Sequence, residues 1–190
     1  MTRITLKESR PRALQQILRF LYSKEEIRFN IRSIDSILTC VKELGLSRLQ
    51  ETCEKSLYQF EKKYVFELIE ITAKHGLKQL YAEAFLYICL HFHDCIKFSS
   101  FLNASYRLLI DILERNLIRD RDEVLLFQRL LEWIEKNKDY IFKYPEHTMR
   151  LLKNINYTKI QPSVLKKLKT EKAFIFQLFN IDHIINETYR

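Results

Sequence analysis

Two eight-residue segments contain the only glycines of the chain: KELGLSRL at residues 42–49 and AKHGLKQL at residues 73–80. Each has a helical pattern before the glycine, a leucine after it, and a second leucine three positions further on. A glycine just after a helix adopts the left-handed conformation that ends the helix, and the next apolar residue packs back onto the last turn. The two segments therefore predict two helical hairpins, centred on Gly45 and Gly76.

The composition around these segments favours helices and excludes glycine-rich folds. Hydrophobic residues make up 47% of the 190 residues, with 13 Phe and 10 Tyr, whereas Gly and Pro occur only two and three times. A sandwich, a barrel or a glycine-rich nucleotide fold needs many turns with positive φ. We therefore expect a mainly α protein of stacked helical hairpins, with at most two short strands near the N-terminus, at residues 4–6 and 26–29.

Apolar spacing and capping residues predict most helix positions. We expect the first helix to begin at Pro11, with an apolar stripe of Leu14, Ile17, Leu18 and Leu21 that is buried. We expect the next helix to be capped by Asn30 or Ser33, with a buried stripe of Ile34, Ile37, Leu38 and Val41. Further along the chain, we expect helices over 81–92, over 105–113, over 123–136 after the cap Asp122, and from Pro145 and Pro162, with a packed tail over 173–185.

The spacing of the two glycines leaves a helical-repeat scaffold as an alternative. Gly45 and Gly76 are 31 residues apart, close to the ~33–34-residue period of ankyrin and tetratricopeptide repeats. No third copy is present near residue 107, so the repeat interpretation is secondary.

Charge and targeting signals narrow the class of partner. The formal net charge is +8, from 32 basic and 24 acidic residues that are spread along the chain. A basic nucleic-acid binder is therefore a third alternative, with a solvated basic face as the more common explanation. The sequence contains no run of ~20 apolar residues and no secretory signal, so we expect no membrane contact. The four cysteines form no CxxC pair. We therefore expect an intracellular (cytoplasmic or nuclear) protein with reduced thiols.

Residues 20–58 resemble the C-terminal half of a BTB domain. The matching positions are the Phe20-Leu21-Tyr22 motif and the run of Leu46, Leu49 and Cys53. Residues 61–168 resemble the BACK domain of kelch-like adaptors, through Ala73, His75-Gly76-Leu77, Leu80, Ala84, His91-Phe92, Phe101-Leu102, Leu113, Glu123, Phe127 and Trp133. The resemblance implies three parts: the C-terminal part of a BTB (POZ) domain at 1–60, a BACK domain at 61–170 and a C-terminal helical tail at 171–190.

This resemblance implies an adaptor or scaffold of BTB-type cullin-RING ubiquitin ligases that presents substrates for ubiquitination. The expected partners are a cullin or other BTB-BACK proteins, and a role as a modulator of full-length BTB relatives is an alternative. The candidate partner-binding surface combines the face of residues 35–42 with the junction between the two domains: Asp35, Thr39, Lys42, Tyr58, Phe60 and Tyr64.

Two departures from the family pattern affect this expectation. The N-terminal half of a BTB domain, with its acidic cullin-gripping element, precedes the segment that the chain matches, so we expect either a fragment or a shortened member with weakened cullin binding. In addition, Lys42 stands where adaptor members often carry an acidic residue.

No pattern in the sequence predicts catalysis, a cofactor or a small-molecule substrate. The densest group of metal-type residues is Cys89, His91, His93 and Cys95, which one helix cannot direct at a single ion because they occupy two different faces. A pair on one face could still recruit His75 or Cys53 from a neighbouring segment. We therefore interpret His91-Phe92 as a packing pair and Cys95 as a small buried residue. Trp133 is interpreted as a core residue rather than an interface anchor, and Glu123 as support for a helix N-terminus.

Overall fold

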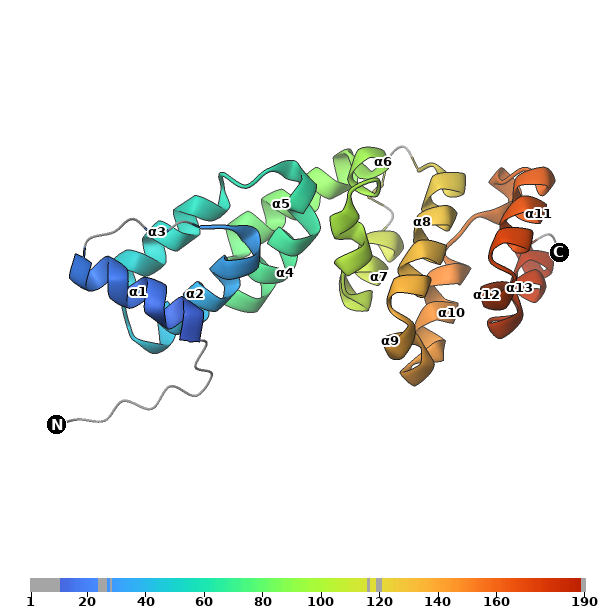
Figure 1. The fold of residues 1–190 in the computed structure, drawn as a ribbon. Coiled ribbons are helices and arrows are strands. Elements are labelled where there is room, and N and C mark those ends of the chain that lie inside the picture. The colour runs from blue at the N-terminus through green and yellow to red at the C-terminus, as the bar shows by residue number, and fades with distance from the viewer. Residues whose placement is uncertain (1–10, 24–26, 28, 116, 119–120, 189–190) are drawn as a thin grey trace. The chain divides into compact units, whose positions relative to one another are not determined.

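A computed structural model describes residues 11–23, 27, 29–115, 117–118 and 121–188 (Figure 1). The chain forms two compact units, residues 1–82 and 83–190. The described residues form helices and connecting turns without a strand, so the predicted mainly α class is confirmed. The strand expected at 4–6 lies outside the described residues. Of residues 26–29 only Ile27 and Phe29 are described, and neither belongs to a strand.

The described residues of unit 1 form four helices, a short 3-10 turn and the beginning of a fifth helix. Its elements are α1 Pro11–Ser23, α2 Ile31–Glu43, α3 Ser47–Leu57, η1 Lys62–Tyr64, α4 Val65–His75 and the first residues of α5 Lys78–Leu90. Asn30 caps α2, because its Oδ1 accepts a hydrogen bond from the Ser33 backbone N–H at 2.9 Å. Ser33 Oγ accepts from the Asn30 N–H at 3.4 Å. The two candidate capping residues thus satisfy each other's backbone donors.

Both glycines end helices as predicted. Gly45 has a φ of 68° and Gly76 a φ of 70°. After α2, the N–H of Leu46 donates to the Val41 carbonyl at 3.0 Å and the N–H of Gly45 to the Lys42 carbonyl at 3.1 Å. The same pair of bonds recurs after α4, where Leu77 and Gly76 donate to the carbonyls of Thr72 and Ala73. This is the Schellman arrangement, so the two predicted hairpin turns are confirmed.

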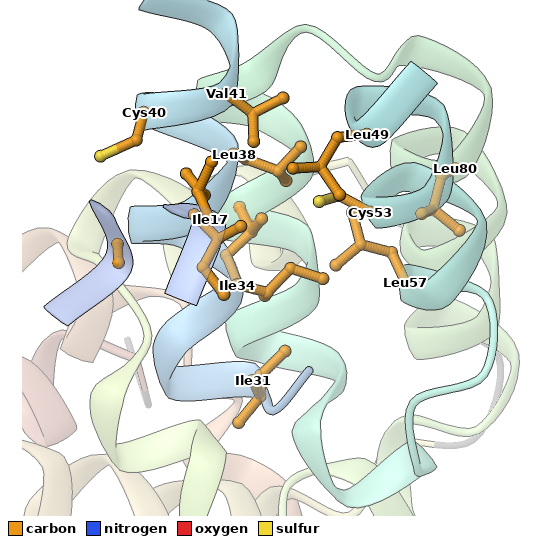
Figure 2. Close-up of a cluster of buried hydrophobic side chains, with 13 residues drawn as sticks. Ile17, Ile31, Ile34, Leu38, Cys40, Val41, Leu49, Cys53, Leu57 and Leu80 are labelled. Carbon is orange, nitrogen blue, oxygen red and sulfur yellow. The ribbon is translucent and has the colours of Figure 1, made fainter. Parts of the chain in front are cut away.

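The core of unit 1 is built around α2 (Figure 2). All four residues of its predicted stripe are completely buried: Ile34, Ile37, Leu38 and Val41. The stripe predicted for α1 is wrong in part, because Leu18 and Leu21 are 43% and 47% exposed. The buried face of α1 instead runs through Ala13 and Ile17. The sequence offers α1 two neighbouring apolar arcs, and only the arc with the small Ala13 packs against the rest of the core.

The described residues of unit 2 form the remainder of α5 and a series of further helices, of which α8 is the longest. These are α6 Phe92–Cys95, η2 Ser99–Asn103, α7 Tyr106–Glu114, α8 Glu123–Lys136, α9 Lys138–Lys143, α10 Pro145–Lys153, η3 Tyr157–Lys159, α11 Pro162–Glu171, α12 Ala173–Leu178 and α13 Ile181–Thr188. Asp122 caps α8 as predicted, with its Oδ1 accepting from the Leu125 N–H at 3.0 Å. Pro145 and Pro162 begin α10 and α11, where a missing N–H costs least.

The helix predicted over 81–92 differs from the structure at both ends. It begins at Lys78, directly after the Gly76 turn, and ends at Leu90, and Phe92 starts the separate short helix α6. The Schellman turn allows the next helix to start two residues after the glycine. The aromatic pattern from Tyr81 onward therefore marked only part of α5.

The core of unit 2 centres on α8. Phe127, Leu130 and Leu131 are completely buried, and Trp133 is 1% exposed with its Nε1–H donating to the Ala104 carbonyl at 2.9 Å. The interpretation of Trp133 as a core residue is therefore confirmed. The predicted packing of the tail is also confirmed, since Ile175, Phe176, Ile181 and Ile184 are buried.

Glu123 does more than support the start of α8. Its side chain is buried, accepts a hydrogen bond from the Asn156 backbone N–H at 3.1 Å, and lies 3.1 Å from Arg121 Nε. The carboxylate therefore ties the start of α8 to the segment before η3. A buried carboxylate needs such partners, because an unpaired charge in the interior is costly.

Candidate protein-interaction surface

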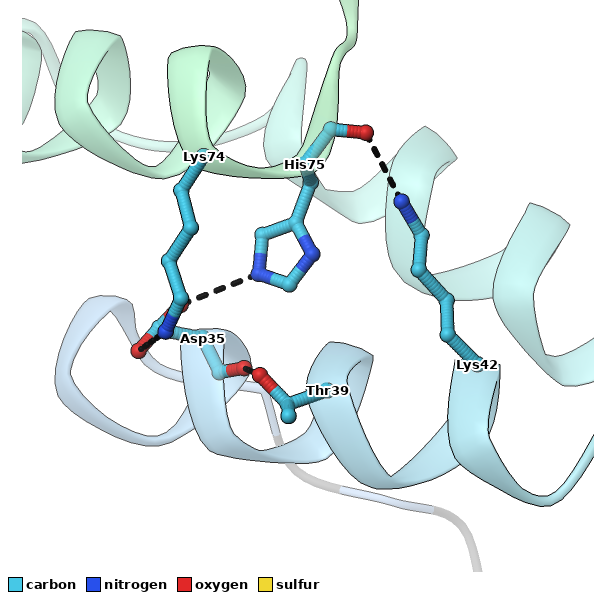
Figure 3. A network of polar contacts seen from close by, with 5 residues as sticks. All are labelled: Asp35, Thr39, Lys42, Lys74 and His75. Atoms are coloured by element: carbon cyan, nitrogen blue, oxygen red, sulfur yellow. Dashed lines mark hydrogen bonds and ion pairs between the residues drawn. The ribbon is translucent and has the colours of Figure 1, made fainter. Parts of the chain in front are cut away.

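Two of the three candidate residues on α2, Asp35 and Lys42, contact the C-terminal end of α4 (Figure 3). Asp35 lies 2.9 Å from His75 Nε2, and Lys74 Nζ lies 3.0 Å from each of its carboxylate oxygens. Thr39 Oγ1 donates to the Asp35 carbonyl at 2.9 Å. Lys42 Nζ donates to the His75 carbonyl at 2.7 Å, one of the four carbonyls that the end of α4 leaves without a helical partner. The polar groups of these candidates therefore stabilise unit 1 internally.

Burial and the neighbouring charges together determine the protonation of His75. The imidazole is nearly inaccessible, with a 5% exposed side chain. Burial lowers the pKa of His75, Asp35 opposes this effect, and the positive charges of Lys42 and Lys74 reinforce it. A neutral ring with its proton on Nε2 fits this arrangement, because the carboxylate then accepts the N–H.

The candidates at the domain junction lie in two different hollows of unit 1. Phe60 and Tyr64 line a groove of about 760 Å³ between the start of α2 and the end of α3. The residues around this groove are Phe29, Asn30, Ile31, Arg32, Ser56, Gln59, Phe60, Glu61 and Tyr64. Tyr58, 54% exposed, lines a separate hollow of about 200 Å³ with Glu54, Leu77 and Lys78. The junction therefore does not form one continuous site.

Aromatic side chains and polar or charged groups both line the groove. Phe29, Phe60 and Tyr64 pack partly against the core and present the rest of their side chains at the surface. Arg32 and Glu61 are exposed at the rim. Glu61 lies 2.6 Å from Lys63, whose ammonium group sits 5.0 Å from the centre of the Tyr64 ring. Apolar walls with charges of both signs at the edge suit the side chains of a protein segment.

Sequence reasoning missed most of this groove. Phe29 to Arg32 and Ser56 to Glu61 are far apart in the chain, and each segment alone carries only capping and helix-end signals. His75 was also missed as the partner of Asp35, although its position next to Gly76 places it at a helix end. No local pattern connects such residues, because the packing of α2 against α3 and α4 brings them together.

All four cysteines are buried free thiols. Within the described ranges, no three His, Cys, Asp or Glu side chains are grouped closely enough to hold a metal ion. Cys89 and Cys95 are buried, whereas His91 is exposed and His93 lies 3.8 Å from Asp122. Burial raises the pKa of Cys53 to about 11, and a thiol becomes nucleophilic only when its pKa is lowered.

None of the described helices combines the length and the apolar character that a membrane span requires.

Comparison with known proteins assigns the chain to a family. The domain described as BTB And C-terminal Kelch (BACK) matches residues 65–170, and the BTB/POZ domain matches residues 1–61. The chain is similar to kelch-like protein 25 of Rattus norvegicus, with 22% identity over 181 residues that make up 95% of this chain and 30% of the relative. It is also similar to kelch-like protein 17 of Homo sapiens, with 23% identity over 153 residues (80% of this chain and 23% of the relative).

A third kelch-like relative matches the chain at a similar identity. Kelch-like protein 11 of Homo sapiens is 24% identical over 163 residues, which are 83% of this chain and 22% of the relative. The chain thus spans less than a third of the length of each of these relatives. The BACK match covers more than half of the chain, and the similarity noted in the sequence is confirmed. The chain therefore belongs to the BTB-BACK family, together with the kelch-like proteins.

Proposed function

We propose that this chain is a protein-interaction module that binds a cullin scaffold and acts as a BTB-type adaptor of cullin-RING ubiquitin ligases. The family resemblance implies cullin binding through the BTB fold and the first BACK helices. One observation indicates which surface would bind the cullin. The groove lined by Phe60 and Tyr64 lies where the BTB match ends, at residue 61, and the BACK match begins, at residue 65.

The groove suits an apolar segment of a partner helix. Phe29, Phe60 and Tyr64 line it, and aromatic residues supply a large share of the binding energy at protein interfaces. An amphipathic helix placed in such a groove would form the centre of an interface of roughly 1,200–2,000 Å² if the complex is stable. Arg32 and Glu61 at the rim would select partners of complementary charge and set the register.

The other candidate residues take supporting roles in this proposal. Asp35 and Lys42 hold α2 against α4 and so fix one wall of the groove, rather than contacting the partner, and Thr39 bonds to the Asp35 carbonyl within α2. Tyr58, in its own hollow, contributes little to the contact. The boundaries at 60/61 and 170/171 between BTB, BACK and tail also stay a prediction.

The test is a binding measurement with purified cullin N-terminal domains, using groove variants of the full chain. Gln59→Trp places a bulky side chain in the groove, and Arg32→Glu reverses a rim charge; both positions are exposed, so the core is left intact. Each variant is expected to weaken binding by tenfold or more, or ~1.4 kcal/mol. The matched control is Glu51→Trp, an exposed position on α3 outside the groove, which should change affinity less than twofold.

Two outcomes would contradict the proposal. One is the absence of binding to any cullin N-terminal domain by a chain that circular dichroism shows to be folded. The other is binding that Gln59→Trp and Glu51→Trp affect equally. If the chain instead binds only intact BTB-BACK proteins, it is a modulator of its relatives and not an adaptor.

A further inference from the structure

Unit 2 contains a second apolar hollow that the proposed cullin contact does not use. It has a volume of about 240 Å³ and lies between the end of α8, α9, and the junction of α11 with α12. Ile134, Ile141 and Ile175 form its apolar lining together with three side chains that remain exposed. These are Phe142 and Phe174, each 60% exposed, and Leu178, 44% exposed.

The size of the hollow indicates what can enter it. Small-molecule and cofactor sites usually occupy roughly 300–1,000 Å³ and enclose most of the ligand. A hollow of about 240 Å³ is smaller than these sites, and is suited to one inserted apolar side chain. Exposed aromatic residues around a pocket that accepts a single anchor are typical of protein interfaces.

The charges at the rim indicate the character of the segment that carries the anchor. Lys172 donates to Glu135 at 2.6 Å, so these two charges compensate each other. Lys138 lines the hollow and is exposed, and no carboxylate is paired with it in the part of the chain that the structure describes. Glu171 also lines the hollow and lies 3.8 Å from Lys167, which is not part of the lining. Among the described residues that line the hollow, Lys138 is therefore the charge that no ion pair compensates.

We propose that this hollow binds an acidic peptide segment of a partner protein, in which one Leu, Phe or Trp side chain is flanked by carboxylates. The apolar side chain enters between Phe142 and Phe174, and a carboxylate pairs with Lys138. This contact is independent of the cullin contact, because it uses only residues of unit 2. The chain would then carry two protein-binding sites, one in each unit.

Two other occupants fit the observations less well. A second copy of this chain also carries a net charge of +8, so pairing through this face would bring like charges together. An anionic membrane would be attracted by the lysines, but the apolar groups line a concave hollow with carboxylates, Glu135 and Glu171, at its edge. Membrane-binding faces instead expose convex apolar side chains on a helix with a basic flank.

The test starts from a random 12-residue peptide library displayed on phage and selected against the full chain. Peptides that also bind the Ala173→Trp variant are removed; Ala173 is exposed and lines the hollow, so Trp fills the space without disturbing the core. The expected survivors contain a Leu, Phe or Trp flanked by Asp or Glu. Survivors without acidic residues, or equal enrichment on the two proteins, would overturn the proposal.

A synthetic copy of the most enriched peptide then provides a quantitative test by fluorescence anisotropy. Lys138→Glu is expected to weaken its binding by tenfold or more. The matched control is Lys153→Glu, another exposed lysine of unit 2 outside the hollow, which should have less than a twofold effect. Equal effects of the two charge reversals would refute the assignment, and this arm does not depend on the folding of Ala173→Trp. Far-UV circular dichroism checks each variant.

Two further measurements distinguish the alternative occupants. The first is co-sedimentation of the chain with phosphatidylserine vesicles. If the chain binds the vesicles, Phe174→Ser abolishes this binding and the acidic peptide does not compete with it, the hollow binds lipid. Self-association in analytical ultracentrifugation that Ala173→Trp abolishes would assign it to a second copy. Either result would overturn the proposal, whereas a monomer that ignores vesicles and binds the acidic peptide supports it.

Discussion

Replacing either glycine by alanine should destabilise unit 1 through backbone strain alone. Gly45 and Gly76 have φ values of 68° and 70°, and a Cβ built at either position meets no other atom within 4 Å. The left-handed conformation costs an L-residue roughly 1–2 kcal/mol. Alanine also reduces the freedom of the unfolded chain, which returns about 0.4–1 kcal/mol. The expected net loss is about 1 kcal/mol for each substitution.

Urea titration followed by far-UV circular dichroism measures this loss. For an m value of roughly 1–2 kcal/mol/M, each Gly→Ala variant lowers the midpoint by about 0.5–1 M, with no change in m. Because the cost lies in the backbone, Gly→Ser at either site should not cost more than Gly→Ala. Gly→Asn should cost less, since asparagine tolerates this conformation.

Two outcomes would refute this reasoning. If both alanine variants are as stable as the parent chain, the helix ends do not need the left-handed conformation. If Asn destabilises as much as Ala, the cost does not come from φ. The Schellman hydrogen bonds of Leu46 and Leu77 would then not account for the two turns.

Three other predictions concern buried groups. Trp133→Phe leaves the Ala104 carbonyl without its donor and opens a cavity, so it should cost about 2–4 kcal/mol in urea titrations followed by circular dichroism; an unchanged midpoint would contradict this. Burial lowers the pKa of His75, so near this pKa the folded state binds fewer protons than the unfolded state. The free energy of unfolding should therefore be greatest above pH ~6.5 and fall as the pH drops below it. His75→Gln should flatten this pH dependence. All four cysteines are buried and free, so a chromogenic disulfide reagent at pH 8 should react with none of them in minutes before urea is added and with all four afterwards; rapid reaction of the folded chain would show that a thiol is accessible.

Local signals in the sequence were sufficient for features that depend on a few adjacent residues. Gly45, Gly76, Asn30 and Asp122 act within one helical turn, so their roles could be predicted from neighbouring residues. The stripe of α2 was also predictable, because its apolar residues form a single arc. The family could be predicted because its residues recur in order along most of the chain.

Features that depend on distant segments could not be predicted. Leu14, Ile17, Leu18 and Leu21 follow helical spacing on α1, but the choice of the arc that packs depends on its partners. The groove at Phe60 and Tyr64 needs Phe29 to Arg32 from another part of the chain. The same holds for the hollow between Phe142 and Phe174, whose walls come from four helices.

Amide hydrogen exchange of the chain, measured by mass spectrometry with and without a saturating cullin N-terminal domain, tests the central claim most directly. If the groove is the cullin-binding surface, exchange slows at residues 29–32 and 56–64 on binding, with little change in α9 and α12. Protection confined to other segments, or no protection at any cullin concentration, would contradict the assignment of this groove as the adaptor surface.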